Sequence, residues 1–167
     1  MTAAALSVML VLALAGCTTS DAVEPTPTPG FASEEEAFAA AEETYRAYVD
    51  AVNARREDPA AENPQHFLIG SALEADIDTQ RLLDESDVRI VGPNTLTTFE
   101  GLSSAEDMMN VTAVACVDAS TSQVVNEQGQ NVTPADRDTS VALDVTFLLV
   151  DGELMISEST VSQDRTC

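Results

Sequence analysis

Apolar and polar residues follow two different periods along this chain, and the period changes once, near residue 88. Before that point the apolar residues recur every three or four positions, which is typical of helices that bury one face. From Val88 onward they tend to alternate with polar residues, which is typical of half-buried strands. The pattern therefore predicts helices first and a sheet afterwards.

The first predicted helix has clear ends in the sequence. Ser33 is a favourable N-cap, and Glu36 stands three positions later, so the two form a capping box. The helix is expected to end at about residues 54–56, because Pro59 disfavours the helical conformation in the residue before it. Its apolar face consists of Phe38, Ala41, Tyr45, Val49 and Val52.

Two shorter helices are predicted next. Asn63 and Pro64 have the residue types of an N-cap and a first helical position. Gly70 interrupts this segment, and Ser71 with Glu74 offers a second capping box for a helix over 72–84.

Six segments have the period or composition of strands. They cover 88–91, 96–102, 108–117, 123–125, 141–149 and 154–156, with turns at 92–94 and 127–130 and a loop over 132–138. Asp151-Gly152 predicts a two-residue hairpin. In that register Phe147 faces Ile156 and Val145 faces Glu158, so Glu158 would lie on the apolar face unless a bulge reverses it.

The chain begins with an apolar run that closes on Leu14-Ala15-Gly16-Cys17, a lipobox. The run is shorter than the roughly 20 residues that span a bilayer, and it resembles a bacterial lipoprotein signal. The resemblance implies cleavage before Cys17 and acylation of its thiol, with palmitate as a typical chain. One departure is the absence of Lys or Arg ahead of the apolar run.

These signals divide the chain into three parts. Residues 1–16 form the predicted signal peptide, and 17–31 form a Thr/Pro-rich tether whose prolines favour an extended conformation. Residues 32–167 form a single α+β domain, in which a long helix and one or two short helices pack on a curved antiparallel sheet of four to six strands.

The net charge of −22 comes from 29 acidic residues against seven arginines, with no lysine. Arg55-Arg56 is the one adjacent pair of bases, whereas a nucleic-acid surface needs clustered Lys and Arg. An anionic lipid surface makes the same demand. We therefore expect no nucleic-acid partner and interpret the acidic excess as a solvated surface.

If Cys17 carries lipid, Cys116 and Cys167 remain. A pair of cysteines in an exported protein favours a disulfide, which would close a loop of about 50 residues and hold the last residue in place. A metal or redox pair is the alternative, but neither cysteine lies in a C-x-x-C motif and His66 is the only histidine.

The order of elements is similar to the nuclear-transport-factor-2-like (SnoaL-like) cone, and the chain resembles small actinobacterial lipoproteins that carry it. The matching features are the lipobox, the Thr-Pro tether, the Tyr45-Arg46-Ala47-Tyr48-Val49 segment and the Asp-Gly hairpin that precedes Cys167. The resemblance implies a hollow between helices and sheet. Members include isomerases, dehydratases and polyketide cyclases as well as many proteins that are not enzymes.

An isomerase-like site would need a carboxylate base and hydroxyl donors. Glu158 and Tyr45 are the candidates, although no base is matched to the family, and the alternative places Tyr45 in the core with Tyr48 at its edge. His66 is interpreted as a surface or packing residue rather than a general base. The acids at 76, 78, 84, 85 and 87 lack the glycine of an EF-hand loop, so we expect no metal and no cofactor.

We therefore expect a lipid-anchored protein on the extracytoplasmic face of the cell membrane. The leading hypothesis is a non-enzymatic domain that binds a small apolar ligand or another envelope protein. A pocket enzyme of the isomerase or dehydratase type is the second hypothesis, and a structural domain that forms homodimers through its sheet is the third.

Overall fold

The computed structural model describes residues 30–167. In chain order the elements are α1 (Glu34–Glu57), the 3-10 helix η1 (Pro64–Phe67), α2 (Gly70–Glu85), β1 (Val88–Val91), β2 (Thr95–Ser104), β3 (Asn110–Asp118), β4 (Gln123–Asn126), β5 (Ser140–Val150) and β6 (Glu153–Val161). No helix within this range is long and apolar enough to span a membrane. The lipobox Leu14–Cys17 and the prolines of the tether lie outside the described residues.

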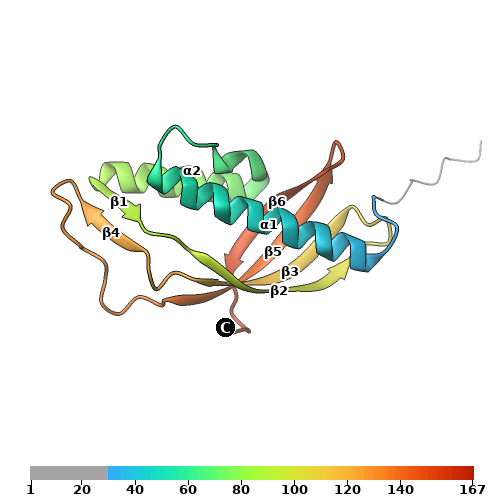
Figure 1. The fold of residues 1–167 in the computed structure, drawn as a ribbon. Helices are drawn as coiled ribbons and strands as arrows, with labels where there is room; N and C mark the ends of the chain where they lie inside the picture. The colour runs from blue at the N-terminus through green and yellow to red at the C-terminus, as the bar shows by residue number, and fades with distance from the viewer. Residues whose placement is uncertain (1–29) are drawn as a thin grey trace, which may run out of the picture.

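The predicted α+β class is confirmed. Four antiparallel strands form the main sheet in the order β2-β3-β5-β6, and β1 pairs with β4 in a separate two-stranded sheet. Both α-helices lie over one face of the main sheet, and the C-terminus lies on the other side (Figure 1). The main core therefore lies between helices and sheet, and a small second cluster of Val114, Cys116 and Ala142 lies on the outer face.

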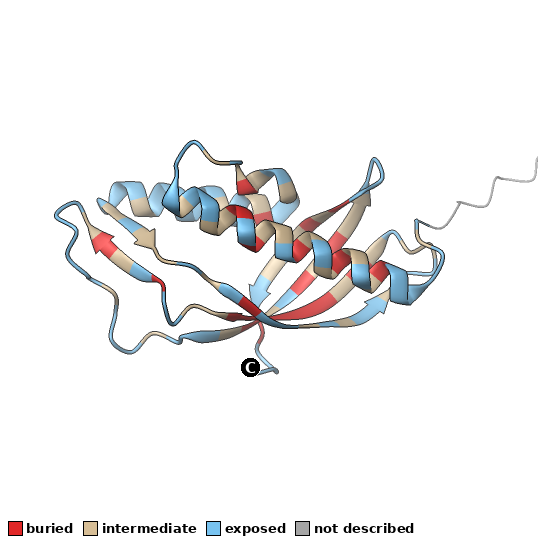
Figure 2. Ribbon diagram, in the orientation of Figure 1, coloured by how far each residue is buried: buried red, intermediate tan, exposed pale blue. Residues whose placement is uncertain are grey.

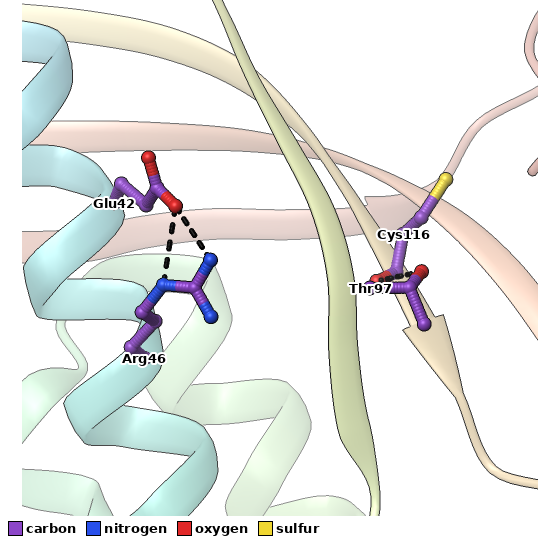
Figure 3. Close-up of polar contacts among 4 residues, drawn as sticks. All are labelled: Glu42, Arg46, Thr97 and Cys116. Carbon is purple, nitrogen blue, oxygen red and sulfur yellow. Dashed lines mark hydrogen bonds and ion pairs between the residues drawn. The ribbon is translucent and has the colours of Figure 1, made fainter.

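Helix α1 begins and ends close to where its sequence indicates. The Ser33 hydroxyl accepts the backbone N–H of Glu36 at 3.2 Å, and Asp58 is the C-cap. The outer side carries an i,i+4 pair in which Arg46 donates to Glu42 (Figure 3). The inner side is buried against the sheet (Figure 2) and includes Ala37, Ala41, Tyr45 and Val49.

The two shorter helices differ from the sequence prediction. Asn63 does cap a helix, but η1 is only four residues long. The second predicted capping box is wrong, because α2 already begins at Gly70 and has no side-chain cap. The Ser71 hydroxyl instead donates to the Ser157 carbonyl oxygen at 3.1 Å. The start of α2 is thus attached to β6 rather than capped by its own side chains.

The inner face of the sheet carries small residues where α1 crosses it. Ala113 and Ala115 on β3 are almost fully buried. On β2, a methyl group at Gly101 would overlap the ring of Phe38. These small side chains allow the helix to approach the sheet closely, because less volume separates the two backbones.

The outer face of the sheet is crossed by the C-terminal segment after β6. Ser162 donates its backbone N–H to the Ala142 carbonyl oxygen at 2.9 Å. The segment then reaches β3, where Cys167 forms a disulfide with Cys116 across 5.7 Å between Cα atoms. The predicted disulfide is therefore present, and it holds the last residue against the sheet.

The β5–β6 hairpin follows the predicted register only near its turn. Leu149 pairs with Leu154 and Phe147 with Ile156, but a bulge follows, so Thr146 pairs with Glu158. The prediction that Glu158 faces Val145 on the apolar side is therefore wrong. Glu158 is exposed on the outer face of the sheet.

One more strand prediction needs adjustment, that of the hairpin after β4. The turn after β4 is closed by the Gly129 N–H donating to the Asn126 carbonyl oxygen at 2.9 Å, as expected. However, β4 finds its extended partner in β1, with Ile90 opposite Val124. The small sheet projects beyond the main one and supports the far end of α2 (Figure 1).

Candidate functional site

A cavity of about 720 Å³ lies between the C-terminal half of α1, helix α2 and strand β1. Its inner wall is formed by β3, β5 and β6 through Val117, Leu143 and Ser159. Its apolar lining comes mainly from Val49, Val52, Leu83, Val88 and Ile90. This size falls within the roughly 300–1,000 Å³ of small-molecule sites.

Aromatic rings separate the cavity from the core. Tyr45 and Tyr48 line it, with their ring centroids 5.8 Å apart. Tyr45 also contacts Phe99 and Phe147 on the sheet, at 6.2 and 6.4 Å between centroids. Tyr45 therefore belongs to the core, as the alternative interpretation expects, while Tyr48 lies at the edge of the cavity.

Burial raises the pKa of both tyrosine hydroxyls. Desolvation raises the pKa of Tyr45 above its ordinary value, and the charge of Tyr48 adds to this effect. Burial, together with the nearby Asp76 carboxylate, raises the pKa of Tyr48 to about 12. Both side chains therefore act as neutral hydrogen-bonding groups near pH 7 and not as bases.

Charged groups surround Tyr48 on the cavity wall. Asp76 on α2 accepts a hydrogen bond from the Gln65 amide at 2.9 Å. Arg56 on α1 donates to the Gly92 carbonyl oxygen at 2.9 Å, and burial lowers the pKa of its guanidinium. Arg55 and Arg89 also line the cavity.

An asparagine pair holds the loop between β1 and β2 onto α1. Asn53 donates its amide to the Asn94 carbonyl oxygen at 2.8 Å and accepts the Asn94 backbone N–H at 2.9 Å. Asn94 also lines the cavity, and its own buried Oδ1 has no hydrogen-bond partner within residues 30–167.

The structure does not bring the two catalytic candidates together. Tyr45 packs on the inner face of the sheet, whereas Glu158 is exposed on the outer face. The bulge after Ile156 exchanges the two sides of β6, so Ser159 lines the cavity where a carboxylate was expected. The isomerase-like site therefore lacks the carboxylate base that Glu158 was expected to supply.

Of the remaining candidates, Asp76 and Asp84 line the cavity, whereas His66 and Asp78 lie on the surface. The His66 imidazole is exposed, 4.0 Å from the Glu62 carboxylate. Among the acids of α2, Asp78 pairs with Arg81 at 3.0 Å. In the described part of the chain, no three His, Cys, Asp or Glu side chains are grouped so that they could hold a metal ion.

Sequence reasoning missed Arg55, Arg56 and Arg89 as site residues. A usable signal was the absence of acidic residues four positions to either side of Arg55 and Arg56, whereas Arg46 follows Glu42 by four. Helical arginines without such a neighbour lack the usual partner on their own helix. Such arginines are free to contact groups on other elements.

Comparison with known proteins identifies a shared fold. No protein-family model matches the chain, and no curated protein matches it. The intermembrane space region of the chloroplast protein ARC6 is similar in structure, with a TM-score of 0.53 and 15% sequence identity over 74% of this chain and 95% of that chain. A polyketide cyclase described as putative, from Xanthomonas campestris pv. campestris, matches at a TM-score of 0.38 and 14% identity, over 75% of this chain and 90% of that one.

Proposed function

We propose that this chain is a bacterial lipoprotein, anchored through lipid on Cys17 to the extracytoplasmic face of the cell membrane. Its domain, of the nuclear-transport-factor-2-like type, binds a small and largely apolar molecule in the cavity beside Tyr48. It carries this ligand without transforming it. The one observation that carries the proposal is the cavity of about 720 Å³, whose wall combines aliphatic side chains and the edge of an aromatic cluster with polar and charged groups.

One feature supports binding rather than catalysis. The carboxylate expected opposite Tyr45, that of Glu158, lies on the other side of the sheet.

The disulfide supports export. A bond between Cys116 and Cys167 is stable in an oxidising compartment and is rare in the cytosol. At the other end of the domain, Gly30 donates its backbone N–H to the Asp107 carbonyl oxygen, and Phe31 packs against the core. Gly30 and Phe31, the last two residues of the predicted tether, are thus already in contact with the domain.

The outer face of the sheet gives little support to the homodimer hypothesis. It carries exposed carboxylates at Glu100, Asp144 and Glu158, and the segment that ends at Cys167 crosses it. Two such faces would bring like charges together, which is unfavourable. Light scattering on a soluble chain that starts at Thr18 should give the mass of one copy.

Native mass spectrometry of that soluble chain, expressed in its host, tests ligand binding. We expect a retained small molecule that is lost on denaturation. Val52→Trp should abolish retention by filling the cavity, whereas Ile77→Trp, at an exposed position of α2, should preserve it. A ligand-free wild-type protein, or equal retention by both variants, would contradict binding in this cavity.

The anchor needs a separate test. Labelling of host cells with a palmitate analogue should mark the wild-type protein, and Cys17→Ala should abolish the label and release the protein from the membrane. The Cys116→Ala variant is the control, because it removes a cysteine but leaves the lipobox intact. Undiminished labelling of Cys17→Ala would refute the lipoprotein assignment.

A further inference from the structure

The cavity collects a large share of the few positive charges in a strongly acidic chain. The sequence holds seven arginines and no lysine against 29 acidic residues. Three of the seven, Arg55, Arg56 and Arg89, line this one cavity. They come from two separate elements, α1 and β1, so adjacency in sequence does not explain their convergence.

These three arginines also differ from the others in their partners. Arg46, Arg81 and Arg165 each lie within 4.0 Å of a carboxylate oxygen, and Arg137 donates to two backbone carbonyls. Within residues 30–167, the three cavity arginines form no ion pair, although acidic residues outnumber arginines about fourfold.

Arg56 is the most confined of the three. One of its N–H groups binds the Gly92 carbonyl oxygen, and burial disfavours its charge. A guanidinium carries five N–H donors arranged to hold a carboxylate or phosphate through two parallel hydrogen bonds. Arg56 therefore keeps spare donors beside the cavity, where a bound anion would offset the cost of its burial.

Three carboxylates, those of Glu57, Asp76 and Asp84, line the same cavity and would repel an anion bound by the arginines. Asp76 already accepts from the Gln65 amide. Glu57 and Asp84 are exposed, and so are Arg55 and Arg89. The formal charges on the wall balance, but Arg56 is half-buried without an ion-pair partner, and taking a charge out of water is costly when no partner compensates for it.

We infer that the ligand is an anionic amphiphile, with its carboxylate or phosphate group held by Arg55, Arg56 and Arg89 and its apolar body against Val52, Leu83 and Ile90. The inference rests on the proposed function and specifies its ligand class. Arginine suits both head groups because its planar fork matches the geometry of their oxygens.

Calorimetric titration of the soluble chain from Thr18 onward tests this inference. That chain keeps every described helix and strand. The probes are decanoate, decyl phosphate, decanol and decylamine, each below its micelle-forming concentration. We expect the two anions to bind at least about tenfold more tightly than decanol, and decylamine to bind more weakly than either anion. The stronger of the two anions identifies the head group.

Variants separate the role of the arginines from that of the fold. Arg55→Gln with Arg89→Gln should weaken decanoate binding about tenfold and leave decanol binding unchanged. Arg46→Gln with Arg81→Gln is the matched control, because it removes the same charge from paired arginines outside the cavity. Arg56→Lys should lower the affinity for the two anions, because lysine keeps the charge but lacks the planar fork of donors. The melting temperature of this variant is measured alongside, since Arg56 also binds the loop at Gly92.

The outcomes distinguish the two levels of the proposal. Equal binding of decanoate and decanol, unaffected by the cavity variants, overturns the anionic head group but retains the ligand cavity. Tightest binding of decylamine overturns it in favour of a cation held by the three carboxylates. Failure of all four probes, together with a ligand-free native mass spectrum, overturns the proposed function itself.

Discussion

The ring of Tyr45 on α1 meets the ring of Phe147 on β5 at 74° between planes, with 6.4 Å between their centroids. Phe147 contacts Phe99 in a similar way, at 63° and 6.1 Å. Such edge-to-face contacts are favourable because the positive edge of one ring meets the negative face of the other. The three rings join helix and sheet, and the ring of Tyr45 also lines the cavity.

Replacing the Tyr45 ring should therefore be far more costly than removing its hydroxyl. We expect Tyr45→Ala to lower the free energy of unfolding by about 3–5 kcal/mol, as for other large aromatic residues in cores. Tyr45→Phe should change it by less than about 1.5 kcal/mol, because the ring contacts remain. Urea denaturation measures both, and equal losses would show that the hydroxyl and not the ring holds this site together.

The contact between Phe38 and Gly101 predicts a coupled pair. Gly101→Ala should destabilise the fold by about 1–3 kcal/mol, because the added methyl group overlaps the Phe38 ring. Phe38→Ala alone also destabilises by removing apolar contacts. In the double variant, the loss of unfolding free energy should be smaller than the sum of the two single losses. Strict additivity of the two losses would exclude the contact.

The disulfide should account for a substantial part of the stability. Replacing both Cys116 and Cys167 with alanine is expected to cost about 4 kcal/mol, since the bond restricts a loop of 51 residues in the unfolded chain. Arg165→Gln is the control on the same segment, and its exposed pair with Glu100 should contribute less than about 1 kcal/mol. A thiol reagent should find no reactive cysteine in the folded, oxidised chain from Thr18 onward.

Alkaline pH should destabilise the domain through its buried tyrosines. Both have a pKa above the ordinary value of about 10 in the folded state, about 12 for Tyr48. Between these values the unfolded chain loses its tyrosine protons first, so the stabilisation is complete below pH 10 and declines as pH rises toward 12. The urea midpoint of the wild type should therefore fall more between pH 8 and 10.5 than that of the Tyr45→Phe, Tyr48→Phe double variant.

Local signals in the sequence predicted the elements well where each element is determined by its own residues. Ser33 and Glu36 start α1 by bonds within one turn, and the alternation from Val141 to Leu149 specifies β5 without outside help. The turn at Asp151-Gly152 needs two residues with positive φ, and these residue types tolerate it.

The bulge in β6 could not be predicted in this way, because it depends on a distant segment. Ile69 donates its backbone N–H to the Ile156 carbonyl oxygen at 2.9 Å, and Ser71 binds the carbonyl of Ser157. The start of α2 thus packs at the bulge, and the two bonded residues, Ser71 and Ser157, lie 86 positions apart in the sequence. The same dependence on distant contacts explains why the cavity arginines escaped notice, since α1 and β1 meet only after folding.

Helix α1 also sets the distance between two ends of the domain. The chain enters the fold at Gly30, beside the start of α1, whereas Arg55 lies 21 residues further along the helix, a rise of about 32 Å at 1.5 Å per residue. Figure 1 shows the N-terminal segment and the small sheet at opposite ends of this helix. Under the proposed anchor on Cys17, the cavity arginines of α1 would therefore lie at the end of the helix remote from the residue at which the chain enters the domain.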